Sequence, residues 1–196
     1  MRVHSEQRTE TRRRLCDAAI EVLAEHGVRE ASFVKVCEKA GLSRGAIHHH
    51  YESMPELLAD VVREIYDRLF TRVIGELPAA DTGKNGLPDA IDTLWSHLQS
   101  PVFRVLLDIR AAMMSDPELA SAVAGPHDRI NREIITRTLE RYGGNLDEAT
   151  VRIILAALTG FALQFFTLAH EPGSRPQAYI SEFLPMLKEF VRKRGH

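Results

Sequence analysis

The stretch GLSRGAIHHHYES, residues 41–53, combines a glycine turn, a serine and three adjacent histidines. Serine accepts hydrogen bonds from the free N–H groups at the start of a helix, so Ser43 predicts a helix that runs to about Tyr51. At about 100° of rotation per residue, one face of this helix carries Arg44, Gly45, His48, His49 and Glu52. The opposite face carries Ile47 and Tyr51, flanked by Ala46 and His50. The pattern predicts a short helix anchored by one face and exposed on the other.

The histidine triplet does not predict a metal site. Adjacent side chains on a helix point about 100° apart, so three consecutive imidazoles cannot converge on one ion. The i, i+4 spacing that suits a helical metal pair is available to His48 only with Glu52. The two cysteines, Cys16 and Cys37, fall at apolar positions of helical patterns, where buried free thiols are expected. We expect neither a metal nor a cofactor.

Helical periodicity extends on both sides of this stretch and predicts an all-α fold. One apolar stripe, at the spacing i, i+3, i+4, i+7 and i+8, consists of Leu15, Ala18, Ala19, Val22 and Leu23. Gly27 predicts the end of that first helix, and Ser32 can cap a short second helix. After the third helix, Ser53 and Glu56 form a capping box that begins a long fourth helix.

The remainder of the chain predicts further helices separated by loops. Residues 78–89, PAADTGKNGLPD, predict a loop because they are rich in turn-forming residues. Helical patterns follow at residues 88–98, 102–114, 116–142, 146–170 and 176–194. Ser115 with Glu118, and Asn145 with Glu148, have the spacing of capping boxes. Gly125-Pro126 predicts an interruption of its helix, and Pro185 predicts a kink or a restart of the last one.

Two short helices joined by a tight glycine turn and braced by a longer helix form a helix-turn-helix. Residues 11–58 resemble the DNA-binding domain of the tetracycline-repressor (TetR) family of bacterial transcriptional regulators. The matching residues are Leu15, Ala18, Ala19, Leu23, Gly27, Ser32, Val36, Ala40, Gly41, Leu42, Ser43, Gly45, Ile47, His50, Tyr51, Ser53 and Leu57. The resemblance implies a helix-turn-helix DNA-binding domain at residues 1–53, followed by a larger helical effector-binding and dimerisation domain at residues 54–196.

The resemblance also implies DNA contacts, position by position. Ser32 takes the place of a phosphate-binding hydroxyl, while Arg44, Gly45 and Ala46 take positions that usually touch bases. His48 replaces a phosphate-binding tyrosine, His49 lies at a variable contact position, and His50 matches a family histidine. The predicted DNA-binding set is Ser32, Lys35, Ser43, Arg44, Gly45, Ala46, His48, His49 and His50. Solvated surface is the alternative for His48, His49 and Lys35, and packing beside the second helix is the alternative for His50.

Arginines give two further expectations. Arg44 is the main candidate for sequence reading, because a guanidinium can bond both O6 and N7 of guanine. Arg12, Arg13 and Arg14 could lie along the DNA backbone or form a solvated charge run. The whole chain has a net charge of −2, so it does not have the generally basic surface of a nucleic-acid coat protein.

The family resemblance implies that the second domain senses a small molecule. Candidate effector-binding residues are Trp95, His97, Phe103, Arg110, Met113, Met114, Phe161, Gln164 and Phe165. Plain core packing is the alternative for each of them. Arg110 lies in a mostly apolar helix, where an uncompensated charge would be costly. It could meet an anionic effector or pair internally with Asp108 or Asp92.

Residues 153–169 carry no charged side chain, which suits either a membrane span or a buried helix. A membrane span is disfavoured because the segment is at the short limit for crossing a bilayer and contains Thr159, Gln164 and Thr167. A helix that is apolar on all sides can instead be buried in a bundle or between subunits. We expect a homodimer formed through the helices near 146–170 and 176–194.

The leading interpretation is a ligand-responsive homodimeric repressor that binds a palindromic DNA operator through the helix at residues 43–51. An enzyme using His97, His127 or His170 as general base is disfavoured, because no nucleophile, phosphate-loop or metal motif accompanies them. A helical protein–protein adaptor is a third possibility. The polar start, MRVHSEQRTETRRR, lacks the apolar segment of a signal peptide, so a cytoplasmic location is expected.

Overall fold

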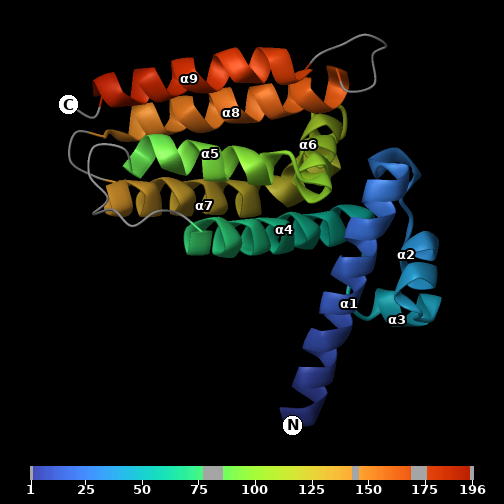
Figure 1. Ribbon diagram of the computed structural model, residues 1–196. Coiled ribbons are helices and arrows are strands. Elements are labelled where there is room, and N and C mark those ends of the chain that lie inside the picture. Colours follow the sequence, from blue (N-terminus) through green and yellow to red (C-terminus); the bar gives the residue numbers. More distant parts are fainter. Residues whose placement is uncertain (1, 77–85, 143–145, 169–175, 195–196) are drawn as a thin grey trace. The chain divides into compact units, whose positions relative to one another are not determined.

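The computed structural model describes residues 2–76, 86–142, 146–168 and 176–194. These residues form α-helices and one 3-10 turn and contain no strand, as predicted (Figure 1). The elements are α1 (Arg2–His26), η1 (Val28–Glu30), α2 (Phe33–Ala40), α3 (Arg44–His48), α4 (Met54–Glu76), α5 (Gly86–Leu98), α6 (Pro101–Met113), α7 (Pro117–Tyr142), α8 (Glu148–Leu168) and α9 (Pro176–Arg194). Helix α5 begins at Gly86, so the last four residues of the predicted loop at 78–89 belong to this helix. Residues 77–85 lie outside the described residues.

The chain forms two compact units. The first comprises residues 1–67 and 105–129, and the second comprises residues 68–104 and 130–196. Helices α4, α6 and α7 therefore each contribute residues to both units. The predicted functional boundary between residues 53 and 54 falls inside the first unit and stays a prediction.

In the first unit, α1, α2 and α3 form the helix-turn-helix. Gly27 and Gly41 end α1 and α2 with positive φ angles of 75° and 64°, a conformation that glycine adopts without steric cost. The side chain of Ser32 accepts a hydrogen bond from the Lys35 N–H, and that of Ser43 accepts one from the Ala46 N–H. The glycine stops and serine caps predicted from the sequence are confirmed.

Apolar side chains from these helices form the core that holds α3. All five residues of the predicted stripe on α1 are buried: Leu15, Ala18, Ala19, Val22 and Leu23. Val36 of α2 and Ile47 of α3 are both 0% exposed, as is Leu57 of α4. Because Ile47 is the buried side chain of a five-residue helix, it anchors α3 to the rest of the unit.

Several predicted helix limits are corrected by the structure. Helix α3 ends at His48 rather than near Tyr51, because the chain tightens there into a turn in which the N–H groups of His50 and Tyr51 both bond the Ile47 carbonyl. The cap of α7 is Asp116 and not Ser115, since the Asp116 carboxylate accepts the Leu119 N–H. Helix α8 is capped by Asp147 through the Thr150 N–H, while Asn145 lies outside the described residues.

The two internal prolines do not interrupt their helices. Helix α7 is continuous through Pro126, and α9 is continuous through Pro185. A proline removes one backbone hydrogen bond, but packing on both sides can hold the helix together. Val123 and Ile130 are buried on either side of Pro126, and Leu187 and Val191 are buried beyond Pro185.

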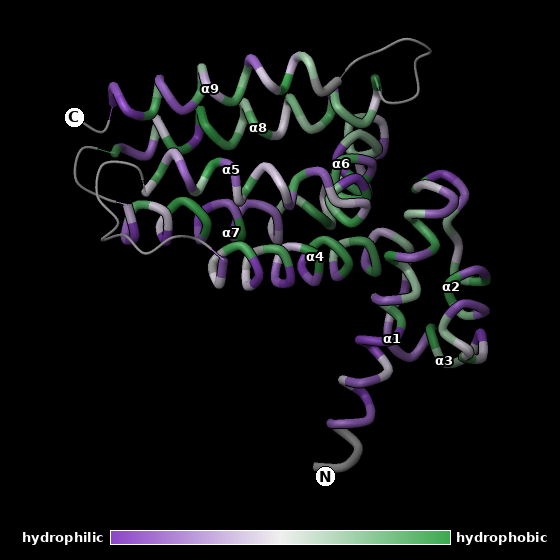
Figure 2. The backbone as a smooth tube through the Cα atoms, viewed as in Figure 1, coloured by the Kyte–Doolittle hydropathy of each residue, from purple (hydrophilic) through white to green (hydrophobic). Residues whose placement is uncertain are grey.

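In the second unit, α5, α8 and α9 lie side by side (Figure 1). Ile135, Leu146 and Val151 form a small buried cluster between α7 and α8, against which Leu87 and Leu139 also pack. Figure 2 shows that α8 is mostly hydrophobic along its length, while the first turns of α1 are hydrophilic. Several apolar residues of α8 nevertheless remain exposed, with Ile153 at 50% and Leu163 at 47%.

The anchoring role of Ile47 gives a testable prediction. Replacing Ile47 by alanine should lower the free energy of unfolding by about 2–5 kcal/mol, since it removes buried apolar contacts and leaves a cavity. Urea denaturation followed by circular dichroism measures this change. Glu38→Ala, an exposed substitution on α2, is the control and should change stability by no more than about 0.5 kcal/mol. Equal effects of the two substitutions would contradict the anchoring role.

Candidate DNA-binding site

The candidate site is the outer surface of α3 and the turn that follows it. Ile47 and Tyr51 are buried, and Ala46 and His50 are partly buried. The residues predicted to face outward are all exposed: Arg44, Gly45, His48, His49 and Glu52. The division into two faces predicted from the sequence is therefore confirmed, although the regular helix ends at His48.

Helix α2 contributes side chains next to this surface. The hydroxyl of Ser32 caps the helix, 3.4 Å from the Lys35 backbone nitrogen, so it is already engaged by its own helix. The Lys35 ammonium lies 3.5 Å from the Glu30 carboxylate, and both groups are accessible to solvent. The ring of Phe33 meets the His48 ring edge to face, with centroids 5.4 Å apart. This contact fixes His48 beside the start of α2.

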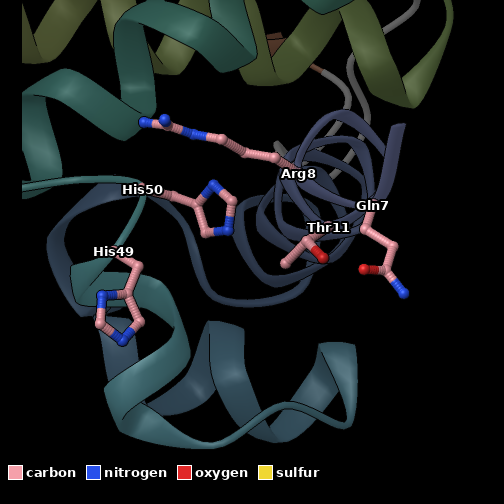
Figure 3. Close-up of a pocket in the computed structure, with 5 residues that line it drawn as sticks. All are labelled: Gln7, Arg8, Thr11, His49 and His50. Atoms are coloured by element: carbon pink, nitrogen blue, oxygen red, sulfur yellow. The ribbon is translucent and has the colours of Figure 1, made fainter. Parts of the chain in front are cut away.

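The last two histidines of the triplet lie in the turn after α3, and the His50 ring points toward α1 (Figure 3). His49 is exposed, whereas His50 is partly buried and its Nδ1 atom is buried with no hydrogen-bond partner among the described residues. Both histidines line a pocket whose other wall is the first part of α1 (Figure 3). Burial, and then the positive charges of Arg8, Arg12 and His49, lower the pKa of His50. The site is thus electropositive where α1 approaches the turn.

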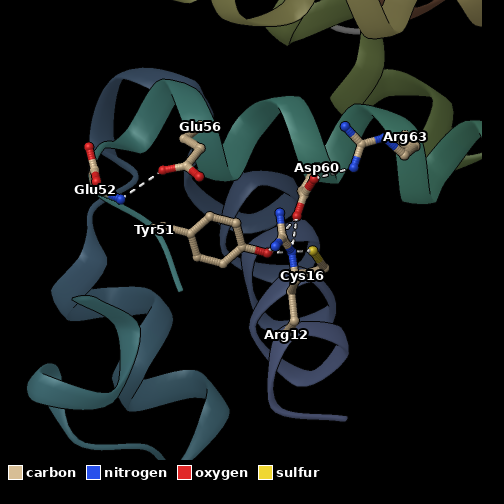
Figure 4. A network of polar contacts seen from close by, with 7 residues as sticks. All are labelled: Arg12, Cys16, Tyr51, Glu52, Glu56, Asp60 and Arg63. Atoms are coloured by element: carbon tan, nitrogen blue, oxygen red, sulfur yellow. Dashed lines mark hydrogen bonds and ion pairs between the residues drawn. The ribbon is translucent and has the colours of Figure 1, made fainter. Parts of the chain in front are cut away.

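A buried polar network holds this turn in place (Figure 4). The Tyr51 hydroxyl donates a hydrogen bond of 2.9 Å to the carboxylate of Asp60 on α4. The same carboxylate forms an ion pair with the Arg12 guanidinium of α1, and its other oxygen pairs with Arg63. The Cys16 sulfur lies 3.4 Å from the Tyr51 hydroxyl. One carboxylate therefore ties α4 to α1 and to the turn that follows α3.

Ionisation in this network follows from its contacts. Burial of Asp60 opposes its ionisation, but hydrogen bonds from Arg12 and Tyr51 and the charges of Arg12 and Arg63 outweigh it, so its pKa is lowered. The hydrogen bond to Asp60 raises the pKa of Arg12. Burial raises the pKa of the Cys16 thiol to about 11. The carboxylate and guanidinium are charged near neutral pH, and the thiol is neutral, as expected for a buried cysteine.

The backbone entering α4 is fixed by a second set of contacts. The Glu56 carboxylate accepts the Glu52 N–H at 2.8 Å, and the Ser53 hydroxyl accepts the Glu56 N–H at 3.4 Å. The predicted capping box is present, with Glu56 reaching one residue further back than Ser53. These bonds fix the connection between the turn and α4 beside Tyr51.

The arginines near the start of the chain are mostly engaged within the protein. Arg12 pairs with Asp60, and Arg13 pairs with Glu10 on the exposed side of α1. Arg14 donates to the Ala40 carbonyl at 2.8 Å, which braces the end of α2. Each of the three arginines therefore makes a contact within the protein, and a position along the DNA backbone stays a prediction.

The candidate effector residues fall into both compact units. In the second unit, Trp95 and Phe103 are buried, and the Trp95 and Phe165 rings meet edge to face at 6.3 Å. Phe161 stacks on Phe183 with ring centroids 3.4 Å apart, whereas Gln164 is exposed. His97 lies 2.8 Å from the Glu76 carboxylate. The structure thus brings Trp95 and Phe165 together.

The other three candidates lie in the first unit. Met114 is 85% exposed, Met113 is partly buried, and Arg110 is exposed. Asp92, one of the two carboxylates considered as a partner for Arg110, is paired with Lys188 instead. Arg110 acts electrostatically on Tyr66 and His127, whose rings meet edge to face at 6.2 Å. Whether Arg110 faces an effector stays a prediction.

The sequence also offers histidines as candidates for a general base or for a metal site. His97 is bonded to Glu76, and His127 lies beside Tyr66; His170 is outside the described residues. No group of three or more histidine, cysteine or acidic residues that could hold a metal occurs within the described parts of the chain.

Comparisons with known proteins find relatives of this chain among transcriptional regulators. Residues 15–61 match the family described as bacterial regulatory proteins, tetR family. The HTH-type transcriptional regulator Rv2912c of Mycobacterium tuberculosis is 28% identical over 191 residues, covering 95% of this chain and 95% of that protein. Residues 15–61 thus carry the DNA-binding segment typical of tetR-family regulators. The chain is a DNA-binding transcriptional regulator.

Solved structures of similar regulators share the fold of this chain. A transcriptional regulator from Rhodococcus sp. Rha1 has a TM-score of 0.67 at 24% identity, covering 93% of this chain and 94% of that one. The multidrug binding protein EbrR, solved with ethidium, has a TM-score of 0.67 at 22% identity, covering 90% of this chain and 98% of that one. The similarity to these structures extends over both compact units.

Some residues of the site could not be predicted from the sequence. Asp60 appears there only as one polar position in a helix, and nothing in its spacing connects it to Arg12, 48 residues earlier. A carboxylate within the apolar run LLADVV is nevertheless a usable signal, since a buried charge requires a partner. Gln7, Arg8 and Thr11, which line the pocket with the histidines, gave no sequence signal.

The Asp60 network predicts a pH-dependent contribution to stability. Asp60→Asn should lower the free energy of unfolding at pH 7 by about 1–3 kcal/mol, because Arg12 and Tyr51 lose a charged acceptor. The lowered pKa means that this contribution is present above the unfolded value near pH 4 and is lost as pH falls through the folded value. Urea denaturation between pH 3 and pH 7 measures the difference between the two proteins.

The difference between wild type and Asp60→Asn should therefore shrink as the solution is acidified. Asp89→Asn removes an exposed carboxylate from the first turn of α5 and serves as the control. A stability difference for Asp60→Asn that stays constant over this pH range would show that the ionised carboxylate is not what stabilises the network.

Proposed function

We propose that this chain is a ligand-responsive homodimeric repressor of the tetR family that binds a palindromic operator through the exposed face of α3 and its following turn. The observation that carries the proposal is the exposed set Arg44, Gly45, His48 and His49 on a segment anchored by buried Ile47 and Tyr51. A recognition helix needs this combination, because one side must enter the major groove while the other is held by the domain.

The proposed DNA contacts divide by chemistry. Arg44 at the first turn of α3 would read base edges, with Gly45 and Ala46 allowing close approach. Ser32, Lys35, Ser43 and the three histidines would contact or position the phosphate backbone, which fixes register without carrying sequence information directly. The structure supports Arg44 in particular, because it is exposed and makes no side-chain hydrogen bond or ion pair with a described residue.

The dimer is proposed to form through α8 and α9. Exposed apolar or small residues recur on α8 at helical spacing: Ile153, Ala156, Gly160 and Leu163. Helix α9 adds Tyr179, 61% exposed, and Met186, 72% exposed. By length and composition α8 could also cross a membrane, and 22% of its most apolar 18-residue window is buried in the single chain.

We favour a second copy of the chain as the cover for this surface. The exposed stripe on α8 lies beside α9, whose outward positions include the charged residues Glu182 and Glu189. A lipid-facing surface would place those carboxylates in hydrocarbon, whereas a subunit interface leaves them at a polar rim. A dimer also supplies the two recognition helices that a palindromic site requires. The proposed location of this regulator is the cytoplasm.

Effector binding is proposed for the helices that follow the DNA-binding segment. The aromatic pair Trp95 and Phe165, with the stacked pair Phe161 and Phe183, supplies apolar ring surface in the second unit. EbrR, which shares the fold, is a multidrug binding protein solved with ethidium. An effector would act by binding one arrangement of the helices better than the other, since only differential affinity shifts an equilibrium.

Electrophoretic mobility shift with duplex DNA from the region upstream of the protein's own coding sequence tests the proposed function. A shifted band that survives excess unrelated duplex is the expected result. The adaptor alternative predicts that no duplex binds specifically at any salt concentration, and that result would end the repressor proposal. Ile47→Ala is not used in this assay, because its loss of binding could reflect unfolding.

The role of Arg44 gives a sharper prediction. Arg44→Ala should bind the operator more weakly and should lose discrimination at one base pair of each half-site, by about 1–3 kcal/mol. Competition with operators substituted one base pair at a time measures this discrimination. Lys39→Ala removes a cation that pairs with Glu21 and Glu25, and as control it should leave the base preferences unchanged. Unaltered preferences in Arg44→Ala would rule out base reading by this residue.

A further inference from the structure

The pocket between α1 and the turn after α3 has a lining suited to an anion. It has a volume of about 380 Å³ and lies wholly within the first unit (Figure 3). Its lining consists of Gln7, Arg8, Thr11, His49 and His50. These supply an amide, a guanidinium, a hydroxyl and two imidazoles, and no carboxylate is among them. Groups of this kind donate hydrogen bonds to phosphate or carboxylate oxygens.

Among the side chains that the structure describes, those of the lining also have no hydrogen-bond partner. None of the five makes a side-chain hydrogen bond or ion pair with a described residue. The Nδ1 atom of His50 is buried and has no hydrogen-bond partner in the described parts of the chain, which is unusual for a nitrogen that can donate or accept a hydrogen bond. A cluster of polar groups that do not satisfy one another points to a partner from outside the chain.

Arg8 contrasts with the arginines that follow it on α1. Arg12 pairs with Asp60, Arg13 with Glu10, and Arg14 with the Ala40 carbonyl. Among the described side chains of α1, Arg8 is the arginine that has no such contact. In Figure 3 its side chain extends from α1 across the same side of the turn as the His50 ring.

The charged groups that act on His50 in this pocket are positive. Arg8 and Arg12 of α1 and His49 of the turn all act on His50 to disfavour its protonated form. The nearest carboxylate of α4 in this network, Asp60, is already engaged by Arg12, Arg63 and Tyr51. A bound anion would relieve this repulsion, whereas a cation would add to it.

We propose that this pocket binds a phosphate group of the DNA backbone, with Arg8 as its main charged contact. The inference rests on the proposed function, and it adds α1 as an element that grips DNA outside the helix-turn-helix segment. DNA phosphate is favoured as the occupant because His49 belongs both to the pocket and to the exposed recognition surface. A free phosphate ion has the same chemistry and is distinguished below.

The salt dependence of DNA binding tests the proposal without knowledge of the operator. Affinity of the full chain for a 30-base-pair duplex of arbitrary sequence is measured by fluorescence anisotropy at several salt concentrations. Loss of one phosphate contact should reduce the slope of log K against log salt by about 0.9. Arg8→Ala should show this reduction and bind roughly tenfold more weakly at low salt.

Two variants serve as controls. Arg8→Lys keeps the charge and should retain the wild-type slope. Arg13→Ala removes an arginine of the same helix that is paired with Glu10 and does not line the pocket, so its slope should also match wild type. Circular dichroism melting curves for all three variants show whether each remains folded. A wild-type slope in folded Arg8→Ala would overturn the inference while leaving the proposed function intact.

An experiment with inorganic phosphate distinguishes a free phosphate ion from a DNA phosphate as the occupant of the pocket. Binding of inorganic phosphate to wild type and Arg8→Ala is measured in the absence of DNA from the change in melting temperature. Phosphate stabilisation that depends on Arg8, together with an unchanged DNA salt slope, would make the pocket a free-anion site and overturn the assignment to DNA. If the wild type bound no duplex at any salt concentration, the proposed function would fail first, and this inference with it.

Discussion

The carboxylate of Asp60 accepts hydrogen bonds from Tyr51 and Arg12, and this contact joins α4 to α1 and to the turn after α3. The recognition helix itself is only five residues long and cannot be stable alone. Its position depends on buried Ile47 on one side and on this polar network at its end. The same helix α4 continues into the second compact unit. A displacement of α4 would therefore act directly on Tyr51, which lies in the turn after α3.

The fold class and the two faces of the recognition segment could be predicted because they follow from local rules. Glycine stops, serine caps and the apolar stripe of α1 depend on residues within a few positions of one another. Exposure of Arg44 and burial of Ile47 follow from helical geometry alone. The interruption predicted at Pro126 was wrong because it used a local rule where packing of Val123 and Ile130 decides the outcome.

The long-range contacts of the site could not be predicted. Arg12 and Asp60 are 48 residues apart, and the sequence left Arg12 equally suited to the DNA backbone and to solvent. The pocket beside His50 depends on how α1 crosses the turn, which no periodicity encodes. The effector residues stay predictions for a related reason: aromatic positions that line a binding site have the same spacing as aromatic positions that fill a core.

We propose that two copies of this chain present their α3 segments to a two-fold symmetric DNA site. Selection of bound fragments from randomised duplex DNA by the wild-type protein tests it most directly. A dimer that binds in this way should enrich an inverted repeat whose half-site centres are separated by about one helical turn, roughly 34 Å, or a multiple of it. Enrichment of a single unrepeated half-site, or of no sequence at all, would contradict it.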